Sequence, residues 1–279
     1  MTLKEAIDIR HSRRSYTPKT LSGQAIEALT DIITQANTTE NLHIQLITGG
    51  EKAFFSLLKT YGLFSGVHTY LAMVGPAGDT RAQELLGYYG ELLVLTAQTF
   101  GLSSCWVGAT FDHGNARAQV GPGEKLYCLI TLGYARENTS LGERLAISMK
   151  GRPHTAEQIM TCRWGGTHHS EDTGDRYGSD KTHRGEDTGD DDWQAGDRHG
   201  SGKTDRSEAP RWFLDGIDAV LKAPSARNRL PVHFTLDQGI VTASCIPNGG
   251  YEYIDLGIAR LHFEIGADYL FYDLRTGQK

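Results

Sequence analysis

The chain of 279 residues is long enough for one large domain or two smaller ones around a sizeable hydrophobic core. Its net charge of −6 argues against a nucleic-acid partner, because proteins that bind nucleic acids carry a basic surface. Its four cysteines are widely spaced and predict reduced thiols rather than disulfides or a zinc site. The first residues lack the apolar run of a signal peptide, and no stretch approaches the roughly 18 apolar residues of a membrane span. We therefore expect a cytoplasmic protein with no membrane partner and no metal site.

The first 135 residues predict alternating helices and strands. Thr2 and Glu5 have the spacing of a capping box, which predicts a helix from Thr2 to Arg10. Ser22 is suited to cap a second helix that is apolar along one side. The other expected elements are a strand over 42–46, a helix over 51–61, a strand over 70–74, a buried helix over 81–100 that ends at Gly101, and a strand over 126–132.

The composition changes between about residues 165 and 208, where aliphatic residues almost vanish and Asp, Gly, His, Thr and Arg dominate. Glu171–Asp175 recurs at Glu186–Asp190, and such a segment cannot bury enough apolar surface to offset its conformational entropy. We interpret 163–208 as a disordered, repeat-expanded insertion. Gly200–Thr204 resembles a phosphate-binding loop, but the first glycine of that motif falls on Asp197 and no strand precedes it. The histidines of the segment could bind a metal loosely, although its composition favours a solvated tract.

Patterns of ordered structure return at Trp212. The expected elements are a helix over 213–222, a turn at 223–228, strands near 232–234 and 240–243, a helix over 254–265 and a last strand over 269–274. The chain therefore divides into a first unit, 1–162, the insertion, 163–208, and a second, shorter unit, 209–279.

Two short segments carry the candidate chemistry. Arg10–Arg14, here called the basic segment, offers guanidinium groups, an imidazole and a hydroxyl, which suit a phosphate because arginine forms charge-assisted hydrogen bonds with phosphate oxygens. It follows the C-terminal end of a helix, whose dipole repels anions, so its side chains must do the binding. Ala223–Asn228, here called the Pro-Ser turn, offers a hydroxyl and an amide that can bind the edge of a flat heterocycle. Each segment also has an ordinary interpretation, as a basic helix end and as a helix-to-strand turn.

A short internal match indicates a duplication. Gln35–Asn41 aligns without gaps with Lys222–Asn228, at a spacing of 187 residues, and we expect both segments to follow a helix and precede a strand. Alanine and asparagine coincide at two of the seven positions, and Thr38 matches Ser225. The match is short enough to arise by chance. If it reflects a duplication, two related units are fused head to tail, and only the first has the basic segment.

Several motifs, taken in order, resemble those of the flavin-dependent nitroreductases, specifically the single-chain, duplicated branch of that superfamily. They are Arg10–Tyr16, Gly87–Glu91, Gly101–Gly108, Leu132–Tyr134, Lys150–Pro153, Ala223–Asn228 and Asp255–Arg260. The resemblance implies an α+β nitroreductase-like fold, with a mixed sheet flanked by helices and a pseudo-dimer within one chain. In ordinary members two subunits build two FMN sites across their interface. Because this chain has one basic segment, the resemblance implies one FMN per chain, in a monomer or weak homo-oligomer.

The resemblance also implies roles for individual residues. Those expected at the phosphate and ribityl chain are Arg10, Ser12 and Arg14, with His11 nearby, and Lys150 and Arg152. Those expected to line the isoalloxazine ring are Pro224, Ser225, Ala226 and Asn228, and those in the loop near its reactive nitrogen are Trp106, Val107, Gly108 and Ala109. Three alternatives stay open. Lys150 and Arg152 could form a solvated basic stretch, Trp106 could be plain core, and Glu91 is more simply a helix-face or interface carboxylate than a catalytic acid.

The implied activity is reduction of a small nitroaromatic or quinone-like acceptor by NAD(P)H, through FMN, in a ping-pong hydride transfer that needs no acid or nucleophile from the protein. The chain departs from the family pattern at three places. No acidic residue stands beside Gly108, Leu230 replaces the usual glutamine before Pro231, and an asparagine expected near 64–67 is not evident. These departures leave open a flavin-binding or degenerate, non-catalytic sensor or interaction protein. A flavin-cleaving or dehalogenating relative is a third possibility.

Overall fold

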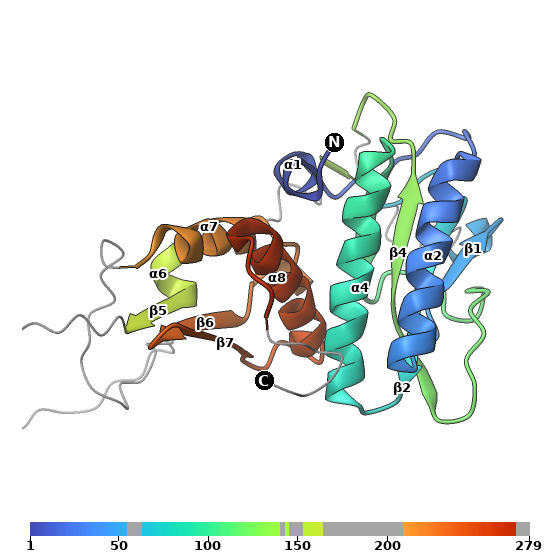
Figure 1. The fold of residues 1–279 in the computed structure, drawn as a ribbon. Helices are drawn as coiled ribbons and strands as arrows, with labels where there is room; N and C mark the ends of the chain where they lie inside the picture. The colour runs from blue at the N-terminus through green and yellow to red at the C-terminus, as the bar shows by residue number, and fades with distance from the viewer. Residues whose placement is uncertain (55–62, 140–142, 145–152, 164–208, 272–279) are drawn as a thin grey trace, which may run out of the picture.

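A computed structural model describes residues 1–54, 63–139, 143–144, 153–163 and 209–271 (Figure 1). The first half contains α1 (Leu3–Ile9), α2 (Gly23–Glu40), β1 (Gln45–Thr48), the 3-10 helix η1 (Glu51–Phe54), β2 (Thr69–Pro76), α4 (Thr80–Thr99), β3 (Ser103–Val107) and β4 (Glu124–Gly133). The second half contains α6 (Ala156–Ile159), β5 (Met160–Arg163), α7 (Arg211–Val220), the 3-10 helix η3 (Ala226–Asn228), β6 (Val232–Asp237), β7 (Ile240–Cys245) and α8 (Glu252–Ala267).

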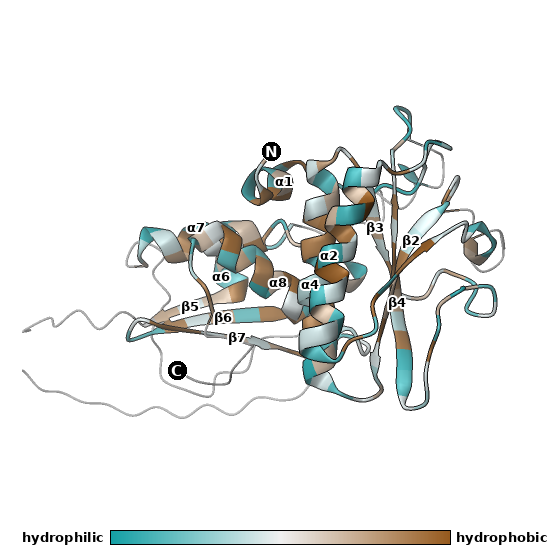
Figure 2. Ribbon diagram, turned by 45° about the vertical axis from the view of Figure 1, so that its right-hand side comes forward, coloured by the Kyte–Doolittle hydropathy of each residue, from teal (hydrophilic) through white to brown (hydrophobic). Residues whose placement is uncertain are grey.

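Each half has its own sheet and its own hydrophobic core. The first sheet has the order β1-β2-β4-β3 and is antiparallel throughout, whereas in the second, β5-β6-β7, the strand β5 pairs parallel with β6. The long helices α4 and α8 lie side by side between the two sheets (Figure 1). Figure 2 shows hydrophobic residues along both helices, as expected for elements buried between two layers. The α+β class with a mixed arrangement of strands and helices is confirmed.

The two halves repeat one order of elements. In the first half a helix, two antiparallel strands and a long helix follow one another as α2, β1, β2 and α4, and in the second half as α7, β6, β7 and α8. The spacing of 187 residues found in the sequence also pairs Gln45, the first residue of β1, with Val232, the first residue of β6. The chain is therefore internally duplicated.

Two glycines allow α4 and α8 to cross closely. A Cβ atom on Gly87 would overlap the carbonyl oxygen of Ile254, and one on Gly257 would overlap that of Glu84. Each glycine thus contacts the residue that lies three positions before the other glycine. Such reciprocal contacts are the pattern of a two-fold interface. The interface that joins two subunits in a symmetric dimer is here inside one chain.

Local signals in the sequence predicted the helix ends correctly. Thr2 forms the expected capping box with Glu5, and the side chain of Ser22 accepts a hydrogen bond from the backbone of Ala25. Gly101 lies two residues after Thr99, the last residue of α4, and has a φ of +73°, a backbone conformation that glycine adopts without strain. No helix in the described part of the chain has the length and apolar character needed to cross a membrane.

Some expected boundaries are wrong. The first strand begins at Gln45 rather than at residue 42, because the side-chain amide of Asn37 takes both backbone groups of Ile44, at 2.8 and 2.9 Å. No strand forms over Tyr269–Phe271, where Glu264 instead accepts hydrogen bonds from the backbone of both residues.

Other differences concern the end of α2, the strand β3 and the residues next to the parts of the chain that the structure does not describe. Gln35–Glu40 forms the end of α2 rather than following it, and strand β3 was not predicted as a strand. Glu51–Phe54 is a 3-10 helix, while the rest of the helix expected over 51–61 lies outside the described residues. The predicted insertion also lies outside them, apart from Arg163, so its boundaries stay a prediction.

Candidate functional site

The basic segment runs in extended form from the end of α1 along the edge of β3. Arg10 is the extended residue that ends α1, and Ser12 pairs with Ser104 in a parallel bridge. The backbone N–H of Arg13 donates to the carbonyl of Ser104 at 2.9 Å. Arg10, Ser12 and Arg14 all lie near the thiol of Cys105, so these three side chains gather on one side of the segment.

Arg13 is committed to the protein itself. Its Nε lies 2.7 Å from the buried carboxylate of Glu143, and its guanidinium also donates to the carbonyl of Arg136 at 2.6 Å. These contacts use the Nε donor and one donor of the Nη2 group within the protein. Arg13 therefore secures the segment.

Arg10 and Arg14 have guanidinium N–H groups without a hydrogen-bond acceptor among the described residues. The Nε of Arg10 is buried and forms no hydrogen bond, since the nearest carboxylate oxygen, on Glu91, is 3.7 Å away. The guanidinium of Arg14 lies 6.0 Å from the ring centre of Phe64 and makes no hydrogen bond to the described residues. A buried cation with unused donors suits an anionic ligand, and this donor set fits the phosphate of FMN.

The basic segment and the Pro-Ser turn meet. The guanidinium of Arg10 donates to the carbonyl of Lys222 at 3.5 Å, across 212 residues of sequence, and Lys222 immediately precedes the turn. The Nζ of Lys222 lies 2.6 Å from Asp8 and forms a second link between α1 and the end of α7. Two segments singled out separately in the sequence are therefore neighbours in the fold.

The end of β3 reaches the same region from the other side. The indole N–H of Trp106 donates to Glu91 at 2.8 Å, and Val107 is buried. A Cβ atom on Gly108 would lie 2.9 Å from the ring of Tyr251, so this glycine lets the loop approach the start of α8. Ala109 is exposed.

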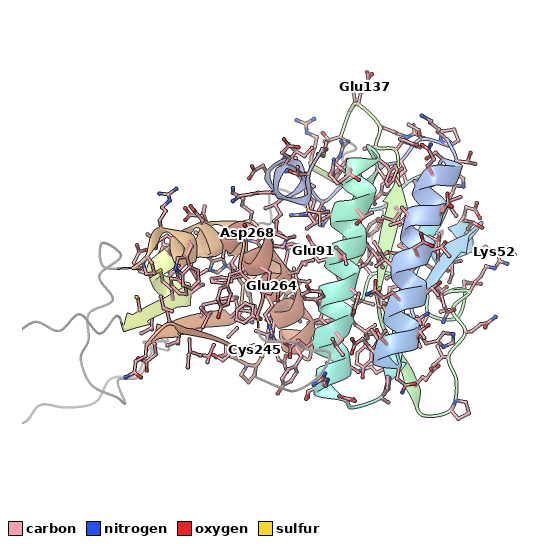
Figure 3. The ribbon with its side chains drawn as sticks, in the orientation of Figure 1. Lys52, Glu91, Glu137, Cys245, Glu264 and Asp268 are labelled. Carbon is pink, nitrogen blue, oxygen red and sulfur yellow. The ribbon has the colours of Figure 1, made fainter. Side chains whose placement is uncertain are left out.

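Glu91 links these pieces from inside α4. Its side chain is fully buried and faces α8, where its Oε1 lies 3.0 Å from Nε2 of His262, which is also fully buried (Figure 3). The carboxylate thus contacts Trp106 and His262 and lies close to Arg10. Glu91 is an interface carboxylate, as its position on the helix indicated.

The Pro-Ser turn is a strained piece of backbone. Arg227, Asn228 and Leu230 all have positive φ values, of +56°, +56° and +44°. Such conformations cost about 1–3 kcal/mol each and persist only where the surroundings impose them. Within the turn, the hydroxyl of Ser225 accepts a hydrogen bond from the backbone of Leu230 at 2.8 Å.

Two buried polar residues hold the turn from outside. Asp255 of α8 accepts the backbone N–H of Ala226 at 2.9 Å and the side-chain amide of Asn248 at 2.9 Å. The same amide donates to the carbonyl of Ala226 at 3.2 Å. Burial raises the pKa of Asp255 to about 6, although both hydrogen bonds oppose this shift.

A hollow of about 230 Å³ lies beside the turn. His154 stands at its edge and donates from Nε2 to the carbonyl of Asn228 at 3.0 Å. The residues that line it are Pro153, His154, Leu221, Ala223, Ser225, Asn228 and Leu230. None of them belongs to the basic segment or to the loop after β3, so the turn faces its own hollow.

The predicted site residues therefore fall into three groups. Arg10 contacts Lys222, the residue just before the Pro-Ser turn, and Trp106 hydrogen bonds to Glu91, whose carboxylate also lies 3.7 Å from Arg10. His11 and Ala109 are exposed, and no contact of their side chains with the turn is present among the described residues. Lys150 and Arg152 lie outside the described residues.

Sequence reasoning gave no role to four polar residues that organise this region, namely His154, Asn248, Asp255, which it named only within a motif, and His262. A signal existed for Asp255 and His262, since each stands between apolar residues of a mostly buried helix, where a buried polar group requires a partner. No local pattern distinguishes His154 or Asn248, whose partners lie in other segments.

Comparison with known proteins identifies the family. The family model described as "Putative TM nitroreductase" matches residues 2–169 and 197–267. The chain belongs to this nitroreductase family. A search of curated proteins returned no match.

One solved structure supports the fold, and two further similar structures have lower TM-scores. A nitroreductase-type structure from Thermotoga maritima is 17% identical in sequence and superposes with a TM-score of 0.55. The alignment covers 95% of this chain and 83% of the Thermotoga chain. An FMN-bound nitroreductase from Bacteroides fragilis is 21% identical and covers 50% of this chain and 92% of its own, with a TM-score of 0.39. The FMN-dependent nitroreductase NfnB from Mycobacterium smegmatis, in complex with NADPH, is 15% identical and covers 48% and 87%, with a TM-score of 0.38.

Proposed function

We propose that the protein is a cytoplasmic FMN-dependent NAD(P)H oxidoreductase that reduces nitroaromatic or quinone-like acceptors. Membership of the nitroreductase family supports an oxidoreductase. The observation that carries the proposal is the contact between Arg10 and the carbonyl of Lys222. It brings a cation suited to a phosphate next to a turn suited to a flat heterocycle, and FMN combines these two chemical features.

Each part of the proposed site has one task. The phosphate and ribityl chain are held by Arg10, Ser12 and Arg14, with Lys150 and Arg152 joining from the segment before Pro153. The ring is held by Pro224, Ser225, Ala226 and Asn228, with the loop Trp106–Ala109 facing it. Because the backbone N–H of Ala226 is already bonded to Asp255, the groups that remain for the ring are the proline surface, the serine O–H and the side-chain amide of Asn228.

Bound FMN would supply a two-electron carrier, which takes hydride from NAD(P)H and then reduces the acceptor in a ping-pong cycle. The chain's own residues contribute binding, orientation and charge. Arg10 and Arg14 would hold the phosphate, and a cationic group beside the ring would stabilise its anionic reduced form. The reaction requires no nucleophile from the protein.

Flavin affinity tests the phosphate assignment. Arg10→Ala and Arg14→Ala each remove a charge-assisted contact worth about 1.5–3 kcal/mol, so we expect FMN affinity to fall roughly 10- to 150-fold. Riboflavin lacks the phosphate, so both variants and the parent should bind it about equally. Arg13→Lys is the matched control, because Arg13 is bonded to Glu143. This variant should bind FMN with an affinity within about threefold of that of the parent. A riboflavin affinity that falls in step with that of FMN would place these arginines elsewhere.

Turnover separates an enzyme from a binding protein. The purified protein should be yellow, should bleach on anaerobic addition of NADPH, and should regain its colour when a benzoquinone or nitroaromatic compound is added. A yellow protein that neither NADH nor NADPH bleaches would instead be a flavin-binding sensor or interaction protein.

A further inference from the structure

The first half of the chain has no carboxylate at the position equivalent to Asp255, and its connection has no strained turn. The reciprocal crossing of α4 and α8 equates Gly87 with Gly257, and this places Leu85 at the position equivalent to Asp255. Leu85 is buried in the core of the first half, where the equivalent connection, up to Glu40, is helical and makes its own hydrogen bonds. The carboxylate and the strained turn therefore occur together, in the second half.

The hydrogen bonds of Asp255 fix the turn at one point. Both carboxylate oxygens are occupied, one by the backbone of Ala226 and the other by Asn248, and Asn248 itself grips the carbonyl of Ala226. Asp255 and Asn248 are 2% and 3% exposed, so water does not compete for these bonds. Ala226 thus has its N–H and its C=O held at the start of the run with positive φ.

We propose that Asp255 is the positioning residue of the flavin site: it holds the Pro-Ser turn in its strained conformation, so that Ser225 and Asn228 are preorganised for the ring. The inference rests on the proposed function. Asp255 acts through Ala226 and does not touch the ligand. Preorganisation of this kind raises affinity because the cost of ordering the turn is met before the ligand arrives.

The ionisation of Asp255 gives this role a measurable signature. Burial raises its pKa to about 6, so the carboxylate takes up a proton as the pH falls through 6. The carboxyl O–H then faces an N–H donor, one hydrogen bond is lost, and the turn relaxes. Ligand binding should therefore be strong above pH 6 and weaker below it.

Three titratable groups beside Asp255 keep their charge between pH 5 and 8. Glu252, on the same helix, accepts the backbone N–H of Asn248, and this lowers its pKa from 4.5, so it stays ionised. Burial raises the pKa of Cys128 on β4, and it raises that of Cys245 on β7 to about 11, so both thiols stay neutral. Among Asp255, Glu252, Cys128 and Cys245, only Asp255 changes charge in this window, and His154, which donates to the carbonyl of Asn228, is a further titratable group on the turn.

Riboflavin binding between pH 5 and 8 tests the inference. The phosphate of FMN titrates near pH 6, so riboflavin is the cleaner probe. With the full chain, we expect riboflavin affinity, measured by flavin fluorescence quenching, to weaken about tenfold from pH 7.5 to pH 5. Asp255→Asn should bind about tenfold more weakly than the parent at pH 7.5 and show no step, because an amide always presents an N–H to one of the two donors. Glu252→Gln is the matched control, since it alters the same turn of α8 and should retain the step.

The possible outcomes distinguish this inference from the proposed function. A parent protein that binds neither flavin overturns the proposed function. The role of Asp255 alone is overturned if the parent binds FMN and Asp255→Asn shows the same riboflavin affinity and the same pH step as the parent. If Asp255→Asn does not fold, Asn248→Ala takes its place. Losing that donor should move the step to higher pH and weaken riboflavin binding, and an unchanged midpoint would refute the inference.

Discussion

The two helix-to-strand connections of this chain match residue for residue in length and differ in structure. In the first half α2 continues to Glu40, and the hydroxyl of Thr38 bonds back to the carbonyl of Thr34, four residues earlier. In the second half α7 ends at Val220, because Pro224 lacks an N–H and disfavours helix at the residue before it. A proline at one position has therefore converted the end of a helix into the Pro-Ser turn.

This difference explains why a duplicated chain would contain one site. A symmetric dimer repeats both parts of its site, whereas here the basic segment belongs to the first half and the Pro-Ser turn to the second. A different buried carboxylate lies beside each of these two segments. Glu91 of α4 accepts a hydrogen bond from Trp106 and lies close to Arg10, whereas Asp255 of α8 accepts a hydrogen bond from the turn. Under the proposed function, each half would supply one part of the site.

The largest expected effect concerns the crossing that holds the halves together. Gly257→Ala and Gly87→Ala each push a Cβ atom into a backbone carbonyl of the facing helix, so we expect each to lower the free energy of unfolding by about 3 kcal/mol. Gly23→Ala, in the first turn of α2, meets nothing within 4 Å and should change stability by less than about 1 kcal/mol. Urea denaturation measures all three. If only one of the crossing variants is destabilised, the two helices do not contribute equally to the interface.

Exchanging the two connections tests which of them makes the site. The second half receives the first-half residues through Pro224→Asn, Ser225→Thr, Ala226→Thr and Arg227→Glu. We expect FMN affinity to fall at least about tenfold, because the rigid turn is lost. Released FMN, measured against protein mass, should also not exceed one per chain in the parent. Two flavins per parent chain would show that the first half has a site of its own.

The reverse exchange should destabilise without adding a site. Asn37→Pro, with Thr38→Ser, Thr39→Ala and Glu40→Arg, places a proline inside α2 and removes the amide that binds Ile44. A proline within a helix costs about 3 kcal/mol, so the melting temperature should fall. The flavin content should not rise above one per chain, since the second half offers no basic segment to a second site.

The matched hydroxyls Ser225 and Thr38 should differ by a smaller amount. Ser225→Ala leaves the part-buried N–H of Leu230 without its acceptor and releases a strained turn, which we expect to cost about 1–2 kcal/mol. Thr38→Ala removes an exposed bond to the helix's own carbonyl and introduces a better helix former, so stability should be unchanged or slightly higher. Thermal melts compare the two. Equal effects would mean that the turn is no more constrained than the helix end.

Sequence patterns predicted the local features well, because those features depend on neighbouring residues. The capping box at Thr2, the cap at Ser22 and the end of α4 at Gly101 each require residues within one or two turns. The start of β1 was misplaced because Asn37 reaches seven residues ahead to Ile44, which no alternation of apolar residues reveals.

The basic segment and the Pro-Ser turn could be proposed from the sequence because their chemistry lies in contiguous residues, and their roles stay predictions. The supports of the site were missed because their partners are distant. Glu91 meets His262 across 171 residues, and Asp255 meets Ala226 across 29. Only the topology of the duplicated fold brings such pairs together. A buried carboxylate in an apolar helix indicates that a partner exists without identifying it.

The smallest expected effect concerns the asparagine that both connections share. Asn41 and Asn228 occupy equivalent positions, and both adopt the left-handed conformation, with φ values of +52° and +56°. Glycine tolerates this conformation, so Asn41→Gly and Asn228→Gly should each change the free energy of unfolding by less than about 1 kcal/mol. Their effects on the ligand should differ. Asn228→Gly removes an amide proposed to bind the flavin ring and should weaken riboflavin and FMN binding alike, by about three- to tenfold, because one neutral hydrogen bond contributes about 1 kcal/mol. Asn41→Gly, on the connection without a turn, should leave both affinities unchanged, and a loss there equal to that of Asn228→Gly would mean that the two halves have not specialised.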